Sequence, residues 1–201
     1  MKRICLNRNR VSNDDGSLPR VETQSPDPIS PYAVAKLAAE RFCTSFSRVY
    51  GMEIVSLRYF NVFGPRQDPT SQYAAVVPRF IRAIADGDAV TIYGDGEQSR
   101  DFTFVDNVVA ANLLAADAPG VEGEILNVAT GGSVTVNALA DAIGELLAKP
   151  VEKAYEPARE ADVRASWADV DAAKRLLGYE PRVDFDDGLR RTADYLLGER
   201  S

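Results

Sequence analysis

The apolar residues of this chain alternate between helical spacing and nearly continuous runs. From Ser30 onward, small and apolar residues form a helical stripe that ends at Gly51, with a good N-cap residue followed by Pro31 at the first helical position. The next segment, Ile54–Phe60, is almost continuously apolar, which is typical of a strand inside a parallel sheet. A long helix followed directly by such a strand predicts part of a doubly wound α/β sheet.

The remaining residues divide into short helices and strands by the same patterns. Helices are predicted at Val77–Asp86, Asp106–Ala116 with Asp106 as the N-cap, Val136–Leu147, Asp169–Leu177 and Phe185–Leu197. Strands are predicted at Val90–Tyr93, Phe102–Val105, Ile125–Ala129 and Val151–Tyr155. No repeat or low-complexity segment separates them, so we expect one domain or two small ones.

Composition excludes several classes of function. The net charge of -7 argues against nucleic acid and anionic membranes as partners. No apolar run reaches the ~18 residues of a membrane span, and the first residues lack the apolar core of a secretion signal, so we expect a cytoplasmic protein. The chain has no histidine, and Cys5 and Cys43 lack metal-ligand spacing, so we expect neither a metal site nor Ser-His-Asp catalysis.

Tyr32 and Lys36 form the pair of residues with the clearest chemical potential. They lie four positions apart, so they share one face of the predicted helix. A phenol is a poor base at neutral pH, but a nearby cation favours its anion, and lowering its pKa by ~3 units requires only about 4 kcal/mol. The pair is therefore a candidate base for a sugar hydroxyl. The same spacing also fits a half-exposed tyrosine beside a solvated lysine on an ordinary amphipathic helix.

Three motifs occur in an informative order: Ser30 to Lys36, Leu57 to Arg66, and Tyr93 to Phe102. Together they resemble the extended short-chain dehydrogenase/reductase family, specifically its nucleotide-sugar 4-epimerases. No Gly-rich dinucleotide fingerprint occurs in the sequence, so the resemblance covers only the later half of the family. It implies an incomplete, C-terminal part of a Rossmann NAD-binding domain in residues 1–62. A smaller α/β substrate-binding region is implied mainly in residues 63–201.

The resemblance also implies roles for residues near the cofactor NAD. Tyr32 would be the catalytic base, and Lys36 would lower its pKa and hydrogen-bond the nicotinamide ribose. Tyr59 and Phe60 match the strand end beneath the nicotinamide. The family places a catalytic serine or threonine hydroxyl on an earlier strand, where this sequence has Arg8. That substitution suggests a truncated or frame-disrupted product.

Six further positions match residues that contact the nucleotide sugar in the family: Asn61, Val77, Arg100, Arg159, Asp162 and Ser166. Arginine suits a diphosphate because its planar fork donates two parallel, charge-assisted hydrogen bonds. Taken singly, however, each arginine also fits a surface ion pair. By the same resemblance, Ser166 matches the family's gatekeeper, which is the residue beside the 2-position of the sugar. A small side chain there leaves room for an N-acetyl group on the sugar.

The resemblance implies an NAD-dependent 4-epimerase for UDP-glucose and UDP-galactose, or for their N-acetylated equivalents. We expect this chain alone to have little or no activity, because a parallel sheet without its first strands has an unpaired edge and an uncovered apolar face. A complementing N-terminal fragment and a second copy of the chain, bound through the Tyr-Lys helix, are its expected partners. The alternatives are a sugar-nucleotide dehydratase or decarboxylase, or a non-catalytic remnant that binds nucleotide sugars without NAD.

Overall fold

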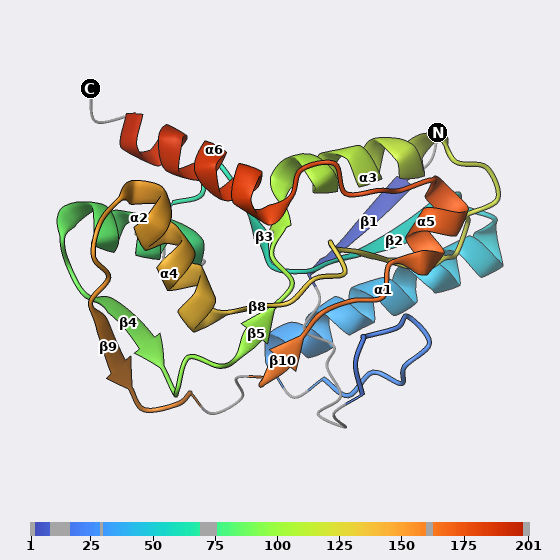
Figure 1. The fold of residues 1–201 in the computed structure, drawn as a ribbon. Coiled ribbons are helices and arrows are strands. Elements are labelled where there is room, and N and C mark those ends of the chain that lie inside the picture. Colours follow the sequence, from blue (N-terminus) through green and yellow to red (C-terminus); the bar gives the residue numbers. More distant parts are fainter. Residues whose placement is uncertain (1–2, 9–16, 29, 69–75, 160–162, 199–201) are drawn as a thin grey trace.

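The computed structural model describes residues 3–8, 17–28, 30–68, 76–159 and 163–198 of the chain (Figure 1). In chain order the elements are β1 (Arg3–Arg8), α1 (Pro31–Tyr50), β2 (Ile54–Tyr59), β3 (Val62–Phe63), α2 (Val76–Asp86), β4 (Val90–Tyr93), β5 (Ser99–Arg100), β6 (Thr103–Phe104), α3 (Val105–Asp117), β7 (Ile125–Val128), β8 (Val134–Thr135), α4 (Val136–Leu147), β9 (Lys153–Glu156), β10 (Ala165–Ser166), α5 (Asp171–Leu177) and α6 (Phe185–Gly198). None of these described helices combines the length and apolar character needed to cross a membrane.

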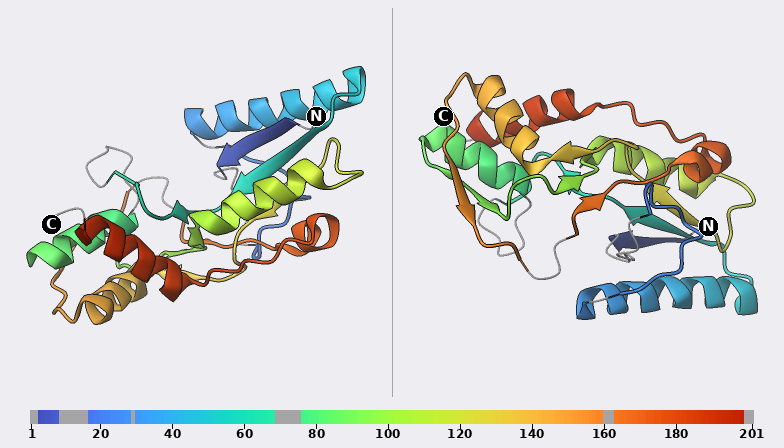
Figure 2. Two further views of the ribbon diagram at one scale, coloured as in Figure 1. Left: turned by 90° about the horizontal axis from the view of Figure 1, so that it is seen from above. Right: turned by 60° about the horizontal axis from the view of Figure 1, so that its bottom comes forward.

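A parallel three-stranded sheet in the order β1-β2-β7 forms one part of the molecule. Helix α1 covers one face of this sheet, while α3 and α5 lie on the other face (Figure 2). The central strand β2 is buried along almost its whole length, as its continuous apolar sequence predicted. The expected α/β fold with a parallel sheet is therefore confirmed.

Helix α1 begins and ends where the sequence predicted. The Ser30 side chain accepts a hydrogen bond from the backbone N–H of Ala33, and Pro31 is the first helical residue. At the other end Gly51 adopts a left-handed conformation with φ 64° and donates its N–H to the carbonyl of Ser47. These caps fix the position of the first turn, which carries Tyr32.

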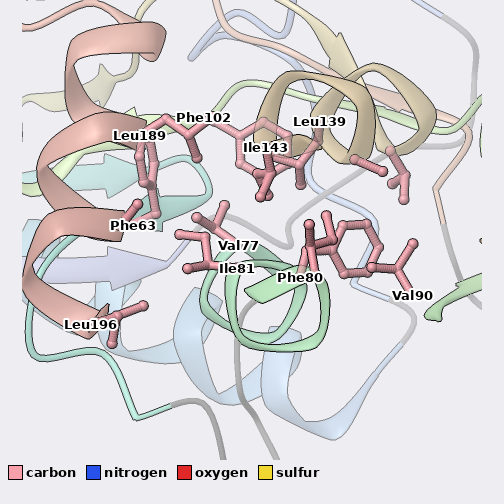
Figure 3. Packing of buried hydrophobic residues seen from close by; sticks show 14 of the residues in the cluster. Phe63, Val77, Phe80, Ile81, Val90, Phe102, Leu139, Ile143, Leu189 and Leu196 are labelled. Carbon is pink, nitrogen blue, oxygen red and sulfur yellow. The ribbon is translucent and has the colours of Figure 1, made fainter. Parts of the chain in front are cut away.

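The second part of the molecule has its own core between α2, α4 and α6 (Figure 3). This core is lined by aliphatic and aromatic side chains, among them Val77, Phe80, Ile81, Phe102, Leu139, Ile143, Leu189 and Leu196. Strands β4 and β9 pair in parallel at the outer end of this part. A further small sheet, in the order β10-β5-β8, lies between the two parts (Figure 1).

Several predicted element boundaries were wrong by one or two residues. Asp106 is not the N-cap of α3: the helix begins at Val105 and its cap, Phe104, makes no side-chain hydrogen bond. The reason is that β6 passes directly into the helix, so Asp106 lies in the first turn, where its charge still favours the helix dipole. Helix α5 likewise begins at Asp171, two residues later than predicted, and Asp169 caps its first N–H.

Candidate functional site

Four of the sequence-predicted site residues, Tyr32, Lys36, Tyr59 and Phe60, lie at the carboxyl end of the parallel strands. Strands β1 and β2 run in the same direction, and α1 runs back between them, so the first turn of α1 lies at the carboxyl end of the sheet (Figure 2, left). In the register of the sheet, Arg8 is the last residue of β1 and pairs with Tyr59. Open α/β sheets bind ligands at this edge.

Tyr32 and Lys36 lie together on the first turns of α1. The Lys36 ammonium is 5.6 Å from the centroid of the Tyr32 ring, and the Tyr32 side chain is 44% exposed. The helix therefore brings cation and phenol together as the four-residue spacing predicted. An exposed phenol beside an ammonium can meet a ligand hydroxyl directly.

The end of β2 directs successive side chains to opposite faces of the sheet. Arg58 points to α1, where both oxygens of Glu40 accept hydrogen bonds of 2.8 Å from its guanidinium. Tyr59 points to α3, where its hydroxyl and the side chain of Asn112 hydrogen-bond. Phe60 is 1% exposed. A contact of Tyr59 or Phe60 with a cofactor would therefore fall to their main chain.

The Glu40–Arg58 ion pair was not predicted from the sequence. Both side chains are buried, with 0% and 6% exposed, and the two parallel hydrogen bonds satisfy the charges. The pair joins α1 to β2 and so fixes the helix that carries Tyr32. The signal in the sequence was a charged residue within an otherwise apolar strand.

Arg100 and Ser166 are brought together by the small sheet. They are register partners on the parallel strands β5 and β10, and the N–H of Asp101 donates to the Ser166 carbonyl at 2.9 Å. Both side chains are partly exposed, and Arg100 Nη1 donates to the carbonyl of Ser99. Arg100, predicted to bind the diphosphate, and Ser166, the predicted gatekeeper, thus lie on adjacent strands.

Arg159 forms a second group with Tyr93, a residue to which the sequence assigned no role. The guanidinium carbon lies 3.8 Å from the centroid of the Tyr93 ring. A hydrogen bond and the positive charge, both from Arg159, lower the pKa of Tyr93. Close by in sequence, Asp95 accepts two hydrogen bonds from Arg164. Hydrogen bonding from Arg164 is the main cause that lowers the pKa of Asp95. Tyr93 begins the motif from Tyr93 to Phe102, and this was the one sign in the sequence that it belongs to the site.

The other predicted substrate residues differ in exposure. Asn61 is exposed, two residues beyond the end of β2, and its carbonyl accepts the N–H of Thr103. Val77 is 0% exposed within the core of the second part, so its side chain cannot reach a ligand. Asp162 lies outside the described residues.

Two carboxyl groups near the site have raised pKa values because burial disfavours their charged forms. Asp101 is enclosed completely, and hydrogen bonds from Thr130 and other donors oppose the upward shift. Glu22, in the loop before α1, accepts the backbone N–H of Asn127 at 2.8 Å, which likewise opposes the effect of burial.

Comparison with known proteins gives a consistent picture. The model of the NAD dependent epimerase/dehydratase family matches residues 11–129. A UDP-glucose 4-epimerase of Mycolicibacterium smegmatis is 35% identical over 177 residues, which are 88% of this chain and 56% of that protein. A UDP-N-acetyl-alpha-D-glucosaminuronate decarboxylase of Bacillus cytotoxicus is 34% identical over 171 residues, 82% of this chain and 52% of that protein.

Solved structures agree over almost the whole chain. A UDP-glucose 4-epimerase from Thermotoga maritima with UDP-glucose has a TM-score of 0.93 at 40% identity, covering 98% of this chain and 64% of that one. A UDP-glucuronic acid 4-epimerase from Bacillus cereus, in complex with UDP-glucuronic acid and NAD, has a TM-score of 0.90 at 30% identity, covering 98% and 61%. The chain therefore spans less than two thirds of the length of these relatives. On the family match and these structural similarities, the chain belongs to the NAD-dependent epimerase/dehydratase family, with part of its Rossmann fold.

Proposed function

We propose that this chain supplies the catalytic base and the sugar-nucleotide contacts of a UDP-sugar 4-epimerase. The observation that carries the proposal is the Tyr32–Lys36 pair, with its exposed phenol, at the carboxyl edge of the parallel sheet. It is supported by the adjacent positions of Arg100 and Ser166 on the neighbouring small sheet. The epimerase relatives and neighbours favour epimerisation over the other reactions of the family.

The chemistry we assign to the chain begins with the sugar 4-hydroxyl. The Tyr32 phenolate accepts its proton, and the Lys36 ammonium stabilises the phenolate by its charge. Bound NAD supplies reversible hydride acceptance, so that hydride can leave C4 and return to its other face. The proton then returns from Tyr32 to the oxygen. A base with a matched pKa typically contributes about 10²–10⁴-fold in rate.

The described residues fit one end of NAD. The exposed phenol and the ammonium beside it, both at the sheet edge where dinucleotides bind, suit the nicotinamide ribose. We assign Tyr32, Lys36 and the main chain of Tyr59 and Phe60 to this end. The sequence holds no Gly-rich segment for the pyrophosphate, and a complementing N-terminal fragment would provide it.

For the sugar nucleotide, we assign the diphosphate to Arg100 and Arg159, with Asn61, Asp162 and the main chain of Val77 as further contacts. Their side chains or main chain offer the charge-assisted and amide hydrogen bonds that a diphosphate and a ribose require. The small side chain of Ser166 admits an N-acetylated sugar as well as glucose and galactose. Residues 63–201 would therefore be mainly the substrate-binding region, and residues 1–62 an incomplete NAD-binding domain.

We also propose two protein partners in a cytoplasmic assembly. The complementing N-terminal fragment would pair along the outer edge of β1, which in the described part of the chain pairs only with β2. A second copy would pack on α1, whose outer face exposes a stripe of apolar side chains: Val34, Phe42, Phe46 and Val49. Exposed patches of this kind mark interaction surfaces.

Thermal unfolding of the purified chain with UDP and with NAD⁺ tests the proposal. UDP should raise the melting temperature, since a ligand at 100 Kd stabilises by about 2.7 kcal/mol, worth about 2–4 °C per kcal/mol at this size. Arg100→Met should abolish the rise, whereas Arg48→Met, an exposed arginine in the last turn of α1, should leave it unchanged. A melting temperature insensitive to UDP would contradict the proposal.

The second candidate is a remnant that binds nucleotide sugars without turnover. It is favoured by the position of Arg8 in the strand that carries a catalytic hydroxyl in the family. Stabilisation by UDP but not by NAD⁺, even with the N-terminal half of a relative added, is the result that this alternative predicts. A decarboxylase, like the Bacillus cytotoxicus relative, would instead release a sugar that has lost C6 as CO₂. A 4,6-dehydratase would release a sugar that has lost its C6 hydroxyl.

A further inference from the structure

Asp101 is a fully enclosed carboxylate directly after Arg100. One of its oxygens accepts hydrogen bonds from the N–H and the hydroxyl of Thr130, at 2.9 and 2.7 Å, and lies 3.5 Å from the Thr103 hydroxyl. The other accepts the N–H of Gly131 at 3.0 Å and that of Ala168 at 3.4 Å. A buried charge costs free energy unless donors surround it, and here every neighbour named is a donor.

These donors come from parts of the chain that are distant in sequence. Thr130 and Gly131 follow β7, so they belong to the turn at the carboxyl end of the parallel sheet. Ala168 follows β10, the strand with the gatekeeper Ser166. Asp101 therefore joins the edge of the parallel sheet to the small sheet that carries the substrate contacts.

The segment after β10 is bonded along both of its edges. Toward the small sheet, the Ser166 carbonyl accepts the N–H of Asp101, and the Ala168 N–H donates to the Asp101 carboxylate. This is the alternation expected of an extended segment, in which every second residue presents its polar groups to the same side.

The opposite edge of the segment is bonded to the loop that leads to α1. The Trp167 carbonyl accepts the N–H of Arg20 at 2.9 Å, and the Asp169 N–H donates to the Arg20 carbonyl at 3.0 Å. Residues 166–169 thus connect the substrate contacts on one side with the approach to the Tyr32 helix on the other.

We propose that Asp101 is a positioning residue: by holding the turn at Thr130–Gly131 and the segment 166–169, it sets Arg100 and Ser166 relative to the Tyr32 helix. The proposal rests on the proposed function, because it assigns Arg100 and Ser166 to the UDP-sugar. Asp101 itself is enclosed and touches no ligand. Its effect on UDP binding therefore passes through the positions of Arg100 and Ser166.

Only a carboxylate satisfies this environment. An asparagine has one acceptor oxygen and one NH₂ group, so in either orientation its NH₂ would face N–H donors. With the amide turned one way it opposes Thr130, and with it turned the other way it opposes Gly131 and Ala168. Asp101→Asn therefore breaks the connection while it preserves side-chain size.

The test uses Asp101→Asn and the milder Thr130→Val, which removes a single donor to Asp101. The matched control is Asn107→Ala. Asn107 is equally buried and bonds the main chain of Arg182 and Val183, before α6, so its loss destabilises the fold without touching the segment 166–169. Trp167, the only tryptophan of the chain, reports on that segment by its fluorescence.

Two readouts are compared in the folded variants: the affinity for UDP by calorimetry, and Trp167 emission with amide exchange at Gly131 and Ala168. We expect Asp101→Asn to weaken UDP binding about tenfold and Thr130→Val about threefold, with changed emission and faster exchange, while Asn107→Ala stays within about twofold. Equal losses in Asn107→Ala and Asp101→Asn, or native emission and exchange in Asp101→Asn, would overturn the positioning role.

The two proposals can fail separately. If the native chain binds no UDP, the proposed function fails, and the spectroscopic readout still decides whether Asp101 holds the segment 166–169. If the native chain binds UDP and both Asp101→Asn and Thr130→Val bind it equally well, the positioning role fails and the proposed function stands. If Asp101→Asn does not fold, Thr130→Val decides by the same two readouts.

Discussion

The ion pair between Glu40 and Arg58 joins α1, the helix that carries the candidate base Tyr32, to the central strand β2. Its two hydrogen bonds of 2.8 Å lie in the interior between α1 and β2. Removing one partner of such a pair leaves a buried charge without compensation. The pairing depends on which faces of the helix and the strand meet, so the sequence alone could not predict it.

Glu40→Gln should therefore lower the free energy of unfolding by about 3 kcal/mol, because Arg58 would keep its buried charge. Urea denaturation of the purified chain measures the loss. Glu122→Gln is the control, since this exposed carboxylate should change stability by less than about 0.5 kcal/mol. Equal stability of the two variants would contradict the structural role of the pair.

Glu22 gives the stability a dependence on pH with a definite sign. Burial raises the pKa of this carboxyl above its unfolded value, so the folded state holds the proton more tightly. Its contribution is full below the unfolded pKa of about 4.3 and is lost as the pH rises through the raised folded pKa. Glu22→Gln removes the titration but keeps an oxygen for the N–H of Asn127.

Urea denaturation at a series of pH values from about 4 upward compares the native chain with Glu22→Gln. The free energy of unfolding of the native chain, minus that of the variant, should fall as the pH rises. A difference that grows with pH would mean that the folded state favours the charged carboxylate instead.

At the scale of elements, α1 has two faces, one packed against the sheet and one exposed. Its inner face buries Ala33 and Glu40 against the sheet, and its outer face leaves large apolar side chains exposed, with Phe42 at 65% and Val49 at 67%. The sequence predicted both ends of this helix because Ser30 and Gly51 are local signals. The start of α3 escaped prediction because it depends on how β6 enters the helix.

Phe42→Glu tests the outer face of α1. We expect the native chain to sediment as a dimer. A charge in the middle of a buried apolar contact disfavours association, so the variant should sediment as a monomer at the same concentration. Leu113→Glu is the control, because Leu113 is 64% exposed on α3, on the other side of the sheet. Dimers that persist in Phe42→Glu would place the self-association elsewhere.

At the scale of the whole molecule, local motifs identified the family and supplied the candidate site residues, whereas the long-range connections came only from the structure. Tyr32 and Lys36 were predictable because four residues of helix fix their proximity. The sequence showed Asp101 only as part of a motif. Its hydrogen-bond partners could not be predicted, since Thr130 and Ala168 are 29 and 67 residues away. Its surroundings depend on the packing of the small sheet against the parallel sheet.

Reconstituted turnover tests the central claim most directly. The chain is co-expressed with the N-terminal half of the Thermotoga maritima epimerase, whose structure matches it with a TM-score of 0.93, and conversion of UDP-galactose to UDP-glucose is measured. We predict turnover that falls at least about 100-fold with Tyr32→Phe, through loss of the base, and stays unchanged with Tyr50→Phe, at the far end of α1. A complex that binds UDP and NAD⁺ but turns over nothing, or that is unaffected by Tyr32→Phe, would contradict the assignment.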